Sequence, residues 1–92
     1  MDYIVSTCPP GHAMLDGKYQ INVSPFPHSG AVPVRYFDTR EQFRAALHFI
    51  GFTDKWIERI LELSDKGETF DSPPMTLSDT VAAEFGWITQ KR

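Results

Sequence analysis

The sequence predicts an α+β fold: a three- to four-stranded antiparallel sheet covered on one face by an αα-hairpin, with a short C-terminal helical segment. Three observations support this prediction. Strand-like runs fill the first part of the chain, two helix-like runs with start and stop signals follow at residues 39–50 and 54–66, and a third helical pattern lies at 79–85. Strands followed by helices are typical of α+β domains, whose helices lie together on one face of the sheet.

Length and charge restrict the classes of function. The 92 residues suit a single domain, 1–92, and the 13% aromatic content supplies a core. The formal net charge of −3 disfavours nucleic acid and anionic membranes as partners, because phosphate groups attract dense cationic surfaces. With one cysteine, no apolar run of membrane-spanning length and no signal-like N-terminus, we expect a cytoplasmic protein without an intrachain disulfide.

Four strands are expected from alternating β-branched and aromatic residues. The pair Asp16-Gly17 between two of them is a strong hairpin signal, because both central residues of a type I′ turn need positive φ. Residues 25–30 are expected to form a loop. Pro33 cannot donate a ladder hydrogen bond, so the last strand is expected either to lie at an edge of the sheet or to begin late. The expected strands are 3–8, 12–15, 18–24 and 32–37.

The first helix is expected at residues 39–50. Phe43, Leu47 and Ile50 recur at helical spacing and form its buried face. Either Asp38 or Thr39 can cap its first turn. Gly51, directly after it, supplies the left-handed conformation that ends helices at low energetic cost.

The second helix is expected at residues 54–66, between the cap Thr53 and the stop Gly67. Ile57, Ile60 and Leu61 form its apolar stripe. Because so few residues separate the two helices, they must pack together as a hairpin.

The C-terminal third carries weaker signals. Residues 68–70 are a candidate short strand, and Pro73-Pro74 interrupts regular structure after it. Ser78 then caps the expected helical segment at 79–85. An extended conformation over residues 76–88 is the alternative.

A surplus of aromatic residues near the helices is the main functional signal. Phe49 and Trp56 lie off the buried stripes of their helices, and Phe52 lies in the turn between them, so an apolar patch at one edge of the hairpin is expected. Interfaces favour aromatic side chains, and exposed apolar patches mark partner sites. The alternative is that the segment containing Trp87 folds back and covers the patch. The candidate binding residues are Phe49, Phe52, Trp56 and Trp87.

The hairpin also has the outline of a helix-turn-helix, with a turn glycine and apolar residues at Ile57 and Ile60 of the second helix. The residues expected on the exposed face of that helix include four acids and two bases, and acids repel phosphate oxygens. A helix-turn-helix-like regulator that binds nucleic acid is therefore an alternative rather than the preferred function.

Cys8, His12 and His28 come from segments that can converge at one end of the sheet. A Cys–His pair is a possible nucleophile and base, and the three residues together are possible metal ligands. Their spacing matches no closed zinc pattern, and no feature near Cys8 stabilises a thiolate. We therefore expect no metal and no cofactor, and a small enzyme or metal-binding protein that uses Cys8, His12 and His28 is the second alternative.

The preferred function is a small non-enzymatic module that binds a protein partner or forms a homodimer. Two surfaces are candidates for the contact: the aromatic patch around Trp56 and the edge strand that contains Pro33. Exposed aromatic residues anchor interfaces, and an unpaired sheet edge can recruit a partner strand.

Overall fold

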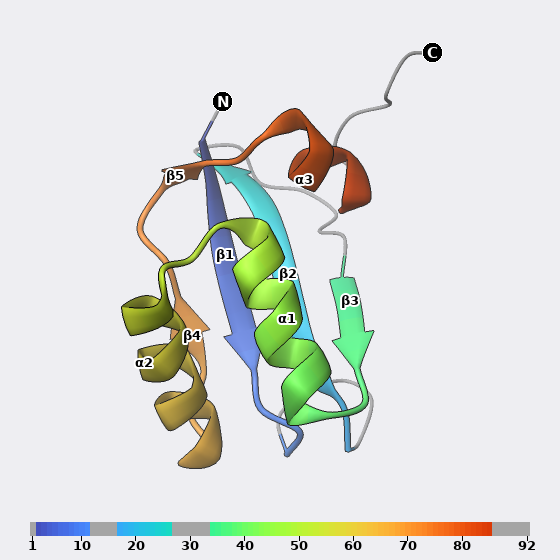
Figure 1. The fold of residues 1–92 in the computed structure, drawn as a ribbon, viewed down its shortest axis with the longest axis vertical. Coiled ribbons are helices and arrows are strands. Elements are labelled where there is room, and N and C mark those ends of the chain that lie inside the picture. The colour runs from blue at the N-terminus through green and yellow to red at the C-terminus, as the bar shows by residue number, and fades with distance from the viewer. Residues whose placement is uncertain (1, 12–16, 27–33, 86–92) are drawn as a thin grey trace.

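The computed structural model describes residues 2–11, 17–26 and 34–85. Helices α1 and α2 lie side by side over one face of the sheet, and α3 lies near one end of it (Figure 1). The predicted α+β arrangement, an antiparallel sheet with an αα-hairpin and a short C-terminal helix, is therefore confirmed. In chain order the elements are β1 (Asp2–Cys8), β2 (Tyr19–Phe26), β3 (Val34–Phe37), α1 (Arg40–Ile50), α2 (Asp54–Asp65), β4 (Phe70–Asp71), β5 (Met75–Thr76) and α3 (Asp79–Glu84).

The strands form one antiparallel sheet in the order β3-β2-β1-β4, and β5 also pairs with β1. Strands β1 and β2 pair along their length, from Asp2 opposite Phe26 to Cys8 opposite Gln20. On its other side β1 pairs with β4 and then with β5. Within the described residues β1 is therefore central and β3 lies at an edge, as expected for that strand.

The expected loop over residues 25–30 is wrong at its start. Strand β2 continues to Phe26, with Pro25 opposite Tyr3. Strand β3 pairs with β2 from Tyr19 only as far as Asn22. Pro25 thus lies where the described part of β2 has a single neighbouring strand, and a residue without an N–H is tolerated there. The expected strand 12–15 and residues 27–33, with Pro33, lie outside the described residues; Gly17 has the positive φ, 78°, expected of its turn.

The C-terminal third contains one short strand more than expected. Strand β4 overlaps the candidate strand at 68–70 by its first residue, and β5 follows the two prolines. Between them the amide of Ser72 donates to the carbonyl of Val5 at 2.8 Å. Ser78 caps α3 as expected, accepting a hydrogen bond from the amide of Val81, so residues 79–84 are helical rather than extended.

The helix caps follow the expected chemistry. Thr39, rather than Asp38, caps α1, because its hydroxyl oxygen accepts a hydrogen bond from the amide of Gln42 at 3.1 Å. Asp38 contributes its backbone amide, which donates to the side chain of Gln42. Thr53 caps α2 through the amide of Trp56 at 3.3 Å.

The core fills the space between the sheet and the helices. Its centre consists of side chains with at most 1% of their surface exposed, from β1, β2 and both long helices. Tyr19 of β2 stacks on Phe43 of α1 with ring centroids 4.9 Å apart. No helix among the described residues is long and apolar enough to cross a membrane. The central core residues are Val5, Ile21, Val23, Phe43, Leu47, Ile57 and Ile60.

Candidate functional site

Two of the predicted binding residues are exposed. Phe49 has 45% of its surface accessible and Trp56 has 44%, and they are the exposed large hydrophobic side chains of the described residues. Phe52 is buried, with its ring edge against Phe70 at 6.2 Å between centroids, so it belongs to the core. Trp87 lies outside the described residues.

Phe49 and Trp56 face different hollows. Phe49 borders a hollow shared by α1, β3 and α3, whereas Trp56 borders one shared by the turn before α2 and the segment around β5. Strands β3 and β4 lie at opposite edges of the described sheet, so these are separate surfaces. We call the first the Phe49 groove, formed by Arg35, Phe37, Gln42, Ala45, Ala46, Phe49, Glu84 and Phe85, and the second the Trp56 hollow, formed by Gly51, Phe52, Thr53, Trp56, Ser72, Pro73 and Met75.

The Phe49 groove has a volume of about 450 Å³ and depends on a second stripe along α1. Gln42, Ala45, Ala46 and Phe49 follow the spacing i, i+3, i+4 and i+7, beside the buried stripe of the same helix. The two alanines are short, which leaves a recess next to the exposed ring of Phe49. The opposite walls come from β3 and α3, with Phe37 and Phe85.

Arg35 connects the two elements of that opposite wall. Its guanidinium donates to the backbone carbonyl of Glu84 at 2.5 Å and to that of Val34 at 3.3 Å. It also lies 5.8 Å from the centroid of the Phe85 ring, at cation–π distance. The guanidinium is thereby held in place by β3 and α3 together. The carboxylate of Glu84 has no hydrogen bond or ion pair within the described residues.

The Trp56 hollow is smaller, about 240 Å³. The indole of Trp56 tilts against the ring of Phe70 with centroids 5.9 Å apart. Pro73 and the half-buried Met75 form its far side. One face of Trp56 therefore rests on the core while the rest of the side chain faces solvent.

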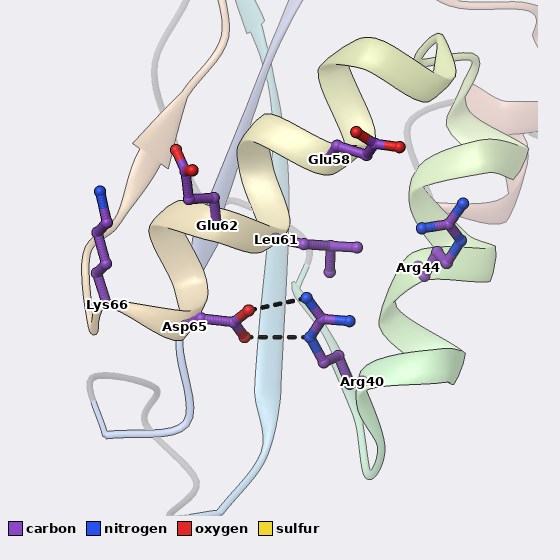
Figure 2. A pocket seen from close by; sticks show the side chains of 7 residues that line it. All are labelled: Arg40, Arg44, Glu58, Leu61, Glu62, Asp65 and Lys66. Carbon is purple, nitrogen blue, oxygen red and sulfur yellow. Dashed lines mark hydrogen bonds and ion pairs between the residues drawn. The ribbon is translucent and has the colours of Figure 1, made fainter.

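A third hollow, about 340 Å³, lies between α1 and α2 and is lined by charged side chains around Leu61 (Figure 2). Arg40 donates two hydrogen bonds to the carboxylate of Asp65, from Nε at 3.1 Å and from Nη2 at 2.8 Å. This contact lowers the pKa of the Asp65 carboxyl below its ordinary value, chiefly through the side-chain hydrogen bond. General acids need the opposite shift and a desolvated cleft. The charged residues of this hollow are therefore explained by an exposed ion pair, Arg40–Asp65, that connects the two helices.

Cys8 ends β1 and is half-buried. Burial raises the pKa of its thiol, and the charge of Asp71 raises it further. Both effects keep the sulfur protonated, whereas a nucleophilic cysteine needs a lowered pKa. His12 and His28 lie outside the described residues. Among the residues that are described, no group of three or more His, Cys, Asp or Glu side chains is placed to hold a metal ion.

The outer face of α2 carries the charges that disfavour a nucleic-acid contact. Asp54, Glu58 and Glu62 are exposed there together with Lys55 and Arg59. Arg59 forms an ion pair with Glu62 at 2.8 Å, which uses one of the two cations within the protein itself. A surface of this composition repels phosphate oxygens.

No protein-family model matches the sequence, and no curated protein or solved structure is significantly similar to it.

Sequence reasoning identified Phe49 but not the groove beside it. The groove combines a helix with a strand and a second helix that lie far apart in the sequence, and their meeting depends on tertiary packing. The one available signal was the spacing of Gln42, Ala45, Ala46 and Phe49, which places a second stripe next to the core stripe.

Proposed function

We propose that this chain is a small non-enzymatic protein-binding module that uses an exposed aromatic side chain as its anchor. The observation that carries the proposal is the position of Phe49, 45% exposed at the border of a groove walled by Phe37 and Phe85. Leaving apolar surface in water costs about 25 cal/mol per Å², and a partner that covers it recovers this free energy. Aromatic anchors beside preformed recesses dominate the binding energy of many interfaces.

The geometry favours binding over catalysis. The charged groups described above are either exposed or shifted in the direction that opposes acid–base or nucleophilic chemistry, as for Asp65 and Cys8. A reducing compartment such as the cytoplasm suits the free thiol of Cys8. The module acts either on another protein or on a second copy of itself.

The test compares the wild type with Phe49→Ala, Trp56→Ala and the control Lys55→Ala. Size-exclusion chromatography with light scattering, over a range of concentrations, measures self-association. Affinity capture followed by rebinding of each captured protein in purified form measures hetero-association. We expect one of these complexes to be lost with Phe49→Ala or Trp56→Ala and kept with Lys55→Ala, because Lys55 is an exposed residue of α2 that lines neither the Phe49 groove nor the Trp56 hollow.

A wild type that stays monomeric at every concentration, and whose captured proteins bind the variants equally, would contradict the proposal. Circular dichroism of each variant confirms that it is folded, so a loss of binding is not a loss of structure.

A further inference from the structure

We infer that the outer edge of β3 pairs with the same edge of a second copy of this chain, with Tyr36 on the two-fold axis. The inference rests on the proposed function and assigns one of its two forms, self-association, to a particular surface. Three features support it: the contrast between the two sheet edges, the symmetry of the pairing, and the charge pattern along β3.

The two edges of the described sheet differ in what they offer to a partner strand. At one edge β4 and β5 have two residues each and are separated by Ser72, Pro73 and Pro74. Such short strands and prolines protect a sheet edge from pairing. At the other edge β3 has four residues, and no strand among the described residues pairs with its outer side (Figure 1). A strand is therefore added more readily at β3, and the blocked opposite edge limits the assembly to a dimer.

Pairing with β2 determines which face of the sheet each β3 side chain occupies. Phe37 lies opposite Tyr19, whose ring stacks on Phe43 of α1, so Phe37 is on the face that the helices cover. Arg35 is two residues away and shares this face, where both side chains line the Phe49 groove. Tyr36 alternates with them and lies half-buried on the other face.

Symmetry leaves few ways to pair two copies of β3. Identical strand edges pair antiparallel about a two-fold axis perpendicular to the sheet, which places one residue directly opposite the same residue of the second copy. An axis at Arg35 or at Tyr36 pairs three residues of each β3, because one residue of the strand then lies on either side of the axis. An axis at Val34 or Phe37, the ends of the strand, pairs a single residue.

The charge pattern favours the axis at Tyr36. An axis at Arg35 sets two guanidinium side chains against each other, and like charges directly opposite destabilise a sheet. An axis at Tyr36 instead sets Arg35 opposite Phe37 of the second copy. There the aliphatic stem and the cation of Arg35 cover a half-buried aromatic ring. On the other face the two Tyr36 rings form an aromatic cross-strand pair, which stabilises the ladder.

The Phe49 groove is continuous with this interface, because Arg35 and Phe37 belong to both. A two-fold axis perpendicular to the sheet keeps the helices of both copies on the same face of the joined sheet. The second copy therefore covers the side of the groove that faces the β3 edge, and Phe49 lies beside the paired strands.

Cross-linking through single cysteines tests the register. Cys8 is the only cysteine of the chain, so Cys8→Ser provides a background without thiols. In it, Tyr36→Cys places two thiols on the axis, where opposite Cα atoms are about 4.5–5.5 Å apart, within the separation of about 4.4–6.8 Å that a disulfide spans. Mild oxidation should give a covalent dimer with Tyr36→Cys, and much less with Arg35→Cys or with the exposed control Trp56→Cys.

Size-exclusion chromatography with light scattering tests the contact without a cross-link. The wild type should reach twice the 10.5 kDa mass of the chain as its concentration rises. Tyr36→Lys should raise the dissociation constant of the dimer by about tenfold, because two like charges replace an aromatic pair, and Tyr36→Phe should keep the dimer. The matched control Ser24→Lys adds the same charge to the same face but on β2, and it should leave the dimer unchanged. Circular dichroism confirms that each variant is folded.

Three results would overturn the inference: a wild type that is monomeric at every concentration, a cross-link that forms more readily with Arg35→Cys than with Tyr36→Cys, and a dimer that Tyr36→Lys leaves unchanged. None of them removes the proposed function if another complex is lost with Phe49→Ala or Trp56→Ala. That function fails separately, when no complex depends on either ring.

Discussion

The hydroxyl oxygen of Ser72 accepts a hydrogen bond from the amide of Val5 at 2.9 Å, and the carbonyl of Val5 accepts one from the amide of Ser72 at 2.8 Å. Ser72 is 5% exposed and lies between β4 and β5. Its side chain thus imitates a backbone carbonyl at the point where the last two strands separate. The central strand keeps its hydrogen bonds across that interruption.

Replacement of Ser72 by alanine should destabilise the fold. The amide of Val5 would lose its acceptor in a buried position, at a cost of about 1–3 kcal/mol. Urea unfolding monitored by tryptophan fluorescence measures the free energy of unfolding. Ser6→Ala, one residue from Val5 on the half-buried opposite face of β1, is the matched control and should change it by less than about 0.5 kcal/mol. Equal effects of the two substitutions would show that the Ser72 hydroxyl has no special role.

Phe43 and Phe49 lie on the same helix in opposite environments, 0% and 45% exposed. Phe43→Ala should cost about 3–5 kcal/mol, because it removes a buried ring and leaves a cavity. Phe49→Ala should cost less than about 1 kcal/mol, as expected for an exposed position. Thermal unfolding of both variants checks this. A large loss with Phe49→Ala would mean that its ring is covered and would remove the basis of the groove proposal.

The thiol of Cys8 should react slowly. Its pKa is raised by burial and by the charge of Asp71, so less thiolate is present at neutral pH. Asp71→Asn should lower that pKa and speed the reaction with a thiol reagent at a fixed mildly alkaline pH. The matched control Asp79→Asn, at an exposed position in α3, should leave the rate unchanged. A faster reaction in the wild type than in Asp71→Asn would contradict this prediction.

The raised pKa of Cys8 also predicts the direction in which the free energy of unfolding changes with pH. A group with a higher pKa in the folded state binds its proton more tightly there, so its contribution to stability is complete below the unfolded pKa. That contribution is lost as the pH rises through the folded pKa. Cys8→Ser should therefore reduce the decline of stability at alkaline pH, which urea unfolding at a series of pH values can measure.

The Arg40–Asp65 pair gives a prediction at acid pH. The pKa of the Asp65 carboxyl is lowered by the side-chain hydrogen bond from Arg40. A lowered pKa in the folded state means that the stabilising contribution is present above the unfolded pKa and lost as the pH falls through the folded pKa. Carboxyl NMR titration should show the pKa of Asp65 rising in Arg40→Gln and staying unchanged in Arg59→Gln, since Arg59 pairs with Glu62 instead.

The helical hairpin was predictable because its signals are local. Thr39, Gly51, Thr53 and Gly67 mark its ends within a few residues of the apolar stripes that they delimit, and the structure uses all four. Strand β5 was not predictable in the same way. It has two residues and is fixed by pairing with Asp2 and Tyr3, more than seventy positions away. A strand this short shows no alternation of apolar and polar residues from which it could be predicted.

The candidate site shows the same contrast. The exposure of Phe49 and Trp56 follows from their helical positions, off the buried stripes. Their separation into two surfaces depends on which sheet edge each helix covers, a property of the tertiary arrangement. Phe52, expected in the same patch, is instead drawn into the core by Phe70 of β4.

The central place of β1 has a consequence for the order of events during synthesis. Strand β1 is translated before its partner β2, and the segment that pairs with its other edge is translated only after both long helices. Until then β1 lacks the strands β4 and β5, which pair with that side of it among the described residues, and the nascent chain carries an open edge there. Contacts between segments so distant in sequence also slow folding. A ribosome stalled after α2 should therefore hold a chain that is more sensitive to protease than the released protein.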